Sequence, residues 1–101
     1  MHTEEPSLDE ILAMLPKNEE QMLSASTPEL ATDAKRKLFD ARTSLEVIWL
    51  DDGDEILYEA MRLLPHDRLH YEQLISSADG QAVVRANISK ARELLQLMEG
   101  K

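Results

Sequence analysis

The sequence predicts an all-α protein, a small helical bundle of four to five helices. Three observations favour this class. No segment keeps a sustained alternation of apolar and polar residues, two long segments carry apolar residues at heptad spacing, and only three glycines and four prolines interrupt the 101 residues. A chain of this length forms one compact domain. We expect two long heptad-patterned helices, two shorter helices between them and a short N-terminal amphipathic helix.

The first predicted element is the short amphipathic helix, in an acidic N-terminal arm that spans residues 1–25. Residues 7–10, Ser-Leu-Asp-Glu, have the spacing of a capping box at a helix start. Apolar residues then fall at i, i+3, i+4 and i+7 on one helix face: Leu8, Ile11, Leu12 and Leu15. Pro16 ends this helix, because the residue before a proline avoids the helical region. Asn18 is a candidate cap for a further short turn over 19–23.

Residues 26–101 form the predicted bundle, and its long helices span about 28–50 and 81–99. Their apolar residues recur at heptad spacing. The two seams are Ala31, Ala34, Leu38, Ala41, Leu45 and Ile48 in the first helix, and Val84, Ile88, Ala91, Leu95 and Met98 in the second. Three alanines in the first seam allow a neighbour to approach closely. We expect near-antiparallel packing in which the two seams face each other.

Two shorter helices are predicted between the long ones, over 53–64 and 66–77. The acidic run around Gly53 breaks the first long helix and starts the next one, because carboxylates stabilise a helix N-terminus. Pro65 separates the two short helices. The Asp-Gly pair at 79–80 is typical of a turn, which we expect before the last helix.

Charge and composition exclude several function classes. The chain has 20 acidic and 11 basic residues, a formal net charge of −9, and residues 1–34 alone hold eight acids against one base. This balance argues against direct binding of nucleic acid or anionic membranes, which need a basic patch. The absence of cysteine excludes disulfides, thiolate metal sites and cysteine nucleophiles. Because we find no signal peptide and no apolar run of membrane-spanning length, we expect a cytoplasmic protein.

No constellation of residues predicts a catalytic site, a cofactor or a metal. His66 and His70 are spaced i, i+4, as in helical metal sites, but the chain has no cysteine and no further histidine except His2 to complete a ligand set. Glu55 and Glu59 form a single carboxylate pair. A magnesium site on facing helices needs a second pair, which the sequence does not offer.

The remaining features point to protein binding. Four arm residues have the i, i+3, i+4, i+7 form of helices that dock in a partner's groove: Leu8, Ile11, Leu12 and Leu15. The sequence of this segment resembles the leucine–aspartate docking motif of adaptor proteins. Trp49 is a second candidate anchor, since tryptophan is over-represented at interfaces. We therefore expect a non-catalytic interaction module, an adaptor, assembly chaperone or inhibitor of a larger protein. Ile11→Asp would then leave the bundle folded and abolish partner binding.

Two alternatives stay open. The first is an acidic decoy that imitates nucleic acid and inhibits a basic DNA- or RNA-binding protein, which predicts binding that weakens steeply with salt. The second is a self-assembling helical protein in which the heptad seams form a homodimer. A contact through the arm predicts weak salt dependence instead, because the burial of apolar surface stabilises it.

Overall fold

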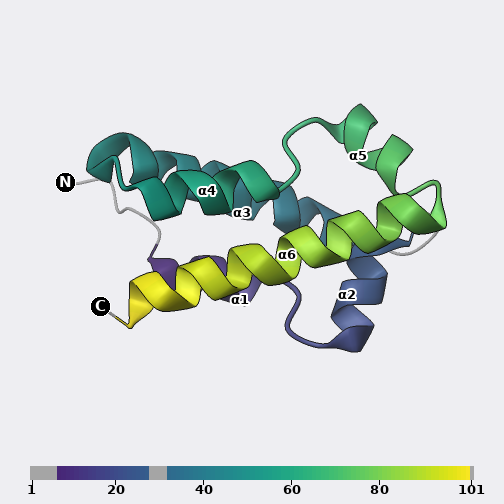
Figure 1. The fold of residues 1–101 in the computed structure, drawn as a ribbon, viewed down its shortest axis with the longest axis horizontal. Helices are drawn as coiled ribbons and strands as arrows, with labels where there is room; N and C mark the ends of the chain where they lie inside the picture. The colour runs from purple at the N-terminus through teal and green to yellow at the C-terminus, as the bar shows by residue number, and fades with distance from the viewer. Residues whose placement is uncertain (1–6, 28–31, 101) are drawn as a thin grey trace.

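The computed structural model describes residues 7–27 and 32–100. Every regular element within these ranges is a helix, which confirms the all-α class (Figure 1). The helices are α1 (Leu8–Met14), α2 (Glu19–Ser26), α3 (Thr32–Asp52), α4 (Glu55–Leu63), α5 (Arg68–Leu74) and α6 (Ala78–Glu99). The described part of the chain thus has six helices rather than four to five, because the arm forms two helices instead of one.

Local capping signals determine where the two arm helices begin. The Ser7 hydroxyl accepts a hydrogen bond from the Glu10 amide, and the Glu10 carboxylate accepts one from the Ser7 amide, both at 3.1 Å. The predicted cap of the next helix is confirmed as well, since the Asn18 side chain accepts from the Gln21 amide at 2.9 Å. The short turn expected over 19–23 continues to Ser26, so α2 is a full helix of eight residues.

The breaks between the later helices lie close to the predicted positions. Gly53 has a φ of +72°, a backbone conformation that side chains with a Cβ rarely adopt, and it separates α3 from α4. Asp54 caps α4, since its carboxylate accepts from the Ile56 amide at 2.7 Å. The predicted turn at 79–80 is wrong, because α6 already begins at Ala78. Gly80 is buried inside this helix, where a Cβ would overlap the Leu74 carbonyl oxygen, so it permits a close approach of α5 to α6.

The six helices surround one core. On one side α4 packs against both α3 and α6, and on the other side α1 and α2 do the same (Figure 1). The two long helices therefore stand at opposite corners of the bundle, and within the described ranges no Cα atom of α3 lies within 8 Å of one in α6. Their seams face a shared interior, but they do not pack directly on each other as expected. The shorter helices fill the space between them.

Residues on both sides of the predicted boundary at 25–26 contribute to this core. Ile11, Leu15 and Ala25 are buried in the same cluster as the bundle residues. The other buried apolar side chains come from α3 to α6 and the segments after α4 and α5: Leu38, Ala41, Leu45, Leu57, Ala60, Met61, Leu64, Tyr71, Ile75, Val84, Ile88, Ala91 and Leu95. The arm helices are thus layers of the bundle, and they bury apolar area that the later helices alone would leave in water.

Tyr71 makes a long-range side-chain contact with α2. Its side chain is 1% exposed, and its hydroxyl donates a hydrogen bond to the carbonyl of Ala25, 46 residues earlier in the chain. The ring of Phe39 meets the Tyr71 ring edge-on, with centroids 5.5 Å apart and planes at 86°. One side chain therefore connects α5 to α2 by a hydrogen bond and to α3 by an aromatic contact.

We expect Tyr71→Phe to lower the free energy of unfolding by about 1–3 kcal/mol, because the buried Ala25 carbonyl loses its side-chain donor while the ring is kept. Denaturant unfolding followed by circular dichroism measures this change. Tyr58→Phe is the matched control. Tyr58 is 42% exposed, and the loss of its hydroxyl should change the free energy of unfolding by less than about 0.5 kcal/mol. Equal effects of the two substitutions would contradict the assigned role of Tyr71.

Burial also raises the pKa of Tyr71 above its ordinary value of 10.0, because the charged tyrosinate would lose its hydration. The unfolded chain releases this proton at lower pH than the folded chain does. The stability that Tyr71 contributes is therefore complete below pH 10.0 and is lost as the pH rises above it. The stability difference between the wild type and Tyr71→Phe should be constant from about pH 8 to about pH 9 and should shrink from about pH 10 to about pH 11. A constant difference over that range would refute the assignment.

Candidate interaction surface

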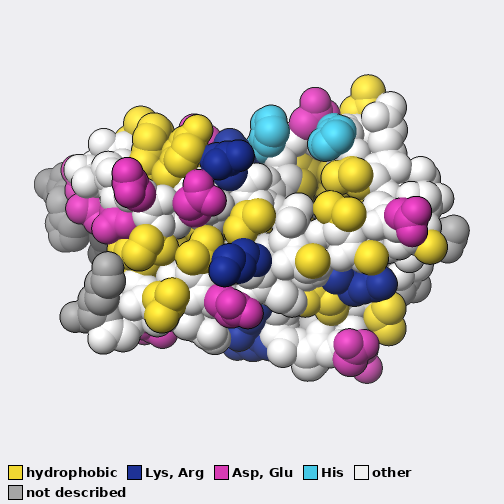
Figure 2. All heavy atoms as spheres, viewed as in Figure 1, with side chains coloured by type: hydrophobic (Ala, Val, Ile, Leu, Met, Phe, Trp, Pro, Cys, Tyr) yellow, Lys and Arg dark blue, Asp and Glu magenta, His cyan; other side chains and the backbone are white. Residues whose placement is uncertain are grey.

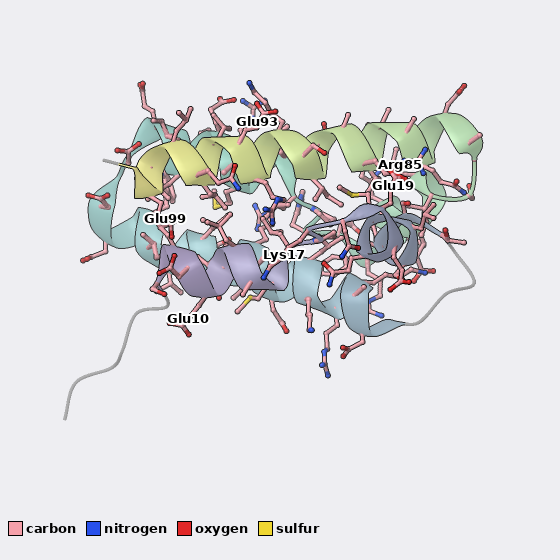
Figure 3. The ribbon with its side chains drawn as sticks, turned by 90° about the horizontal axis from the view of Figure 1, so that it is seen from below. Glu10, Lys17, Glu19, Arg85, Glu93 and Glu99 are labelled. Atoms are coloured by element: carbon pink, nitrogen blue, oxygen red, sulfur yellow. The ribbon has the colours of Figure 1, made fainter. Side chains whose placement is uncertain are left out.

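The stripe of α1 that was predicted to bind a partner faces the protein's own interior. Ile11 and Leu15 are 0% and 1% exposed, and Leu8 and Leu12 are half-buried against the same core. Figure 3 shows α1 alongside α6, and α1 also packs on α3. The interaction role of this stripe stays a prediction. A partner that used it would first have to displace α1 from the bundle.

Trp49, the second predicted anchor, lies half-buried near the end of α3. Its ring packs against the ring of Tyr58 on α4, with centroids 5.3 Å apart and planes at 36°. The Arg62 guanidinium lies 5.9 Å from the centroid of the Tyr58 ring and forms an ion pair of 3.1 Å with Glu59. The indole therefore packs on a second aromatic ring, and a partner would meet both rings together.

Exposed apolar side chains lie in the same α3–α4 segment. Leu50 is 72% exposed, and Val47, one turn earlier on α3, is about half-exposed. We define the α3–α4 corner as Val47, Trp49, Leu50 and Tyr58. The sequence interpretation missed Tyr58 and did not assign Val47 or Leu50 to a site. The available signal was the position of Val47 and Leu50 in the sequence. They lie close to Trp49 but off the heptad seam, which predicts apolar side chains that point away from the core.

Carboxylates cluster along the same segment. Residues 46–59 contain six acids and no lysine, arginine or histidine. The acids are Glu46, Asp51, Asp52, Asp54, Glu55 and Glu59. Arg42 pairs with Glu46 at 3.0 Å, but Asp51, Asp52 and Glu55 are exposed and have no basic group within 4.0 Å in the described ranges. Figure 2 shows apolar and acidic side chains side by side at the N-terminal end of α4. The corner is therefore apolar, aromatic and negative at once.

The two histidines that resembled half of a metal site lie elsewhere. His66 and His70 are exposed and line a small cavity of about 160 Å³, which has an apolar lining that includes Leu74 and Ile88. Among the residues that the structure describes, no group of three or more metal-ligating side chains comes together. None of the described helices has both the length and the apolar character needed to cross a membrane.

Comparison of the chain with protein-family models, curated proteins and solved structures found no match.

The burial of Ile11 reverses the result expected for Ile11→Asp. A carboxylate at this fully buried position leaves an unpaired charge and a cavity, so we now expect a loss of about 3 kcal/mol or more in the free energy of unfolding. Leu23→Asp introduces the same charge at a half-exposed position of α2 and should cost about 1 kcal/mol or less. Thermal unfolding of the two variants measures the difference. A fully folded, cooperative Ile11→Asp variant would show that α1 is separable from the bundle.

Proposed function

We propose that this protein is a non-catalytic protein-binding module and that its contact surface is the α3–α4 corner. The partner is a larger protein with a basic surface that surrounds an apolar groove or patch. The observation that carries this proposal is the exposure of Leu50, Val47 and Tyr58 within a segment of six acids and no base. An adaptor, an assembly chaperone or an inhibitor would each use such a surface.

The two properties of the corner have different physical roles in binding. Aromatic and large aliphatic anchors supply most of the affinity in protein interfaces when they become fully desolvated, and tryptophan and tyrosine are enriched among them. The Trp49–Tyr58 contact restricts both side chains before binding, which lowers the conformational entropy lost on association. The surrounding carboxylates steer a basic partner and repel acidic ones. This combination favours a basic partner that also presents apolar surface.

An acidic decoy that imitates nucleic acid is the alternative that the charge supports. Such a decoy needs carboxylates at the spacing of phosphates, and it has no need of exposed leucine and tyrosine among them. The corner is apolar and aromatic, and carboxylates surround it. The decoy and the protein-binding module therefore differ in how much of the binding free energy comes from apolar contact. The salt dependence of binding separates them.

The test uses two synthetic helical peptides, one with lysines and leucines on opposite faces and one in which serines replace the leucines. Trp49 is the only tryptophan, so its fluorescence reports directly on the corner. We expect the leucine peptide to bind at least about tenfold more tightly than the serine peptide, a difference of about 1.4 kcal/mol. Leu50→Ser should remove most of this preference. Leu69→Ser on α5, a leucine of similar exposure outside the corner, should leave it unchanged.

Equal binding of both peptides, with an affinity that collapses at high salt, would overturn the proposal in favour of the decoy. In cells, a photo-crosslinking amino acid in place of Leu50 should capture a basic protein that the same substitution at Leu69 does not capture. Crosslinks only between copies of this chain would instead support the self-assembling alternative.

A further inference from the structure

A second surface, which shares no residue with the α3–α4 corner, has the opposite charge character. It is a groove of about 520 Å³ between the segment that leads into α2 and one face of α6. Lys17 and Glu19 line one wall, and Arg85, Arg92 and Glu93 line the other. Figure 3 labels Lys17 ahead of α2 and Arg85 on α6. Three bases and two acids give the groove a net charge of +1, in a chain whose formal net charge is −9.

The three cations of the groove differ from most arginines elsewhere in the described structure in their lack of an ion pair. Three arginines elsewhere form ion pairs with a carboxylate one helical turn away: Arg36, Arg42 and Arg62. Lys17, Arg85 and Arg92 have no carboxylate within 4.0 Å in the part of the chain that the structure describes, although Glu19 and Glu93 line the same groove. Their positive charge is therefore not neutralised locally.

Arg92 adds an observation that itself points to a ligand. Its Nη1 atom is shielded from solvent and has no hydrogen-bond acceptor in the described structure. A buried donor without an acceptor costs free energy, and the cost is larger for a charged group. Arg85 is only slightly better satisfied, because its Nη1 atom donates one long hydrogen bond, of 3.4 Å, to the hydroxyl of Ser26. An anion in the groove would compensate both guanidinium groups.

The spacing of these arginines indicates the shape of the anion. Arg85 and Arg92 are seven residues apart on α6, so they lie on the same face at a separation of about 10.5 Å along the helix axis. A polyproline II segment advances about 3.1 Å per residue and completes one turn in about three residues, so side chains at i and i+3 lie on the same face about 9 Å apart. Two carboxylates at positions i and i+3 of such an extended segment therefore match the two guanidinium groups.

The remaining lining of the groove favours a peptide over a dense polyanion. Glu19 and Glu93 would repel closely spaced phosphates such as those of nucleic acid, whereas they permit two isolated carboxylates. Pro16, Met22 and Ala86 supply apolar surface for the side chains between them. We infer that the groove between α2 and α6 binds an extended acidic peptide segment of a partner, with carboxylates three residues apart facing Arg85 and Arg92.

The experiment titrates the full chain with a short peptide that carries aspartates at positions i and i+3 between prolines and alanines, which favour polyproline II, and follows backbone amides by nuclear magnetic resonance. Two further peptides have the same composition with adjacent aspartates, or asparagines in place of both aspartates. We expect shifts that concentrate around the groove, with affinity at least about fivefold higher for the i, i+3 peptide than for the adjacent one, about 1 kcal/mol. The asparagine peptide should not bind.

Arg92→Gln should weaken binding by about tenfold or more, and Lys17→Gln, at an exposed position, gives a second variant that keeps the fold intact. Lys90→Gln is the matched control, since Lys90 is an exposed base on the same helix outside the groove, and it should change affinity by less than about twofold. Arg92→Gln should also leave the melting temperature unchanged or raise it, because it removes a buried nitrogen donor that has no acceptor. A purely structural role for Arg92 would instead lower it.

Several results would overturn the inference. One is an equal loss of affinity in Arg92→Gln and Lys90→Gln, which would indicate an effect of overall charge only. Others are equal binding of the i, i+3 and adjacent peptides, or shifts that lie outside the groove. Inorganic phosphate is titrated in parallel, and saturable binding of phosphate without binding of any acidic peptide would replace the inference with a small-anion site.

Discussion

The hydrogen bond from the Tyr71 hydroxyl to the Ala25 carbonyl holds together parts of the chain that local sequence cannot bring together. An eight-residue helix such as α2 is marginal in water, and its last carbonyls have no partner within the helix. Tyr71 satisfies one of these carbonyls in the interior, while Phe39 fixes the tyrosine ring against α3. Ser26, next in the chain, is fully buried and accepts a hydrogen bond from Arg85. Arg85, which lines the groove between α2 and α6, therefore binds the residue next to the carbonyl that Tyr71 satisfies.

A chain of 101 residues has few apolar residues beyond those that its core needs, and this determines which surfaces remain for binding. The long helices stand at opposite corners, so α4 must cover their seams on one side and the arm helices on the other. Ile11 and Leu15 are buried where the arm helices pack on the core. What remains for binding are exposed residues that the core does not need, such as Leu50 on α3, and half-buried charges that no neighbour neutralises, such as Arg92. The two candidate surfaces are consequences of the packing as well as of the sequence.

Features encoded within a few residues could be predicted, and features that depend on distant residues could not. The capping box at residues 7–10 and the Asn18 cap are local, so the starts of both arm helices followed from the sequence. The extension of α2 to Ser26 did not, because it is stabilised by Tyr71, 46 residues away from Ala25. Gly80 has the local signature of a turn but lies inside a helix where α5 approaches it. Trp49 was singled out, yet its partner Tyr58 follows only once α3 and α4 form a hairpin.

The opposite charges of the two surfaces imply different modes of association. A basic partner is attracted to the whole molecule from a distance, so the field that guides it to the α3–α4 corner acts before any contact forms. An acidic peptide experiences little of the repulsion from the net charge of −9 beyond about 8–10 Å, because salt screens charges at such distances, and it gains no long-range attraction either. Its affinity must then come from short-range contacts with Arg85 and Arg92. Added salt weakens the first association, whereas in the second it screens the repulsion together with the attraction. Long-range charge is therefore expected to speed association at the corner, whereas the groove is expected to discriminate by geometry.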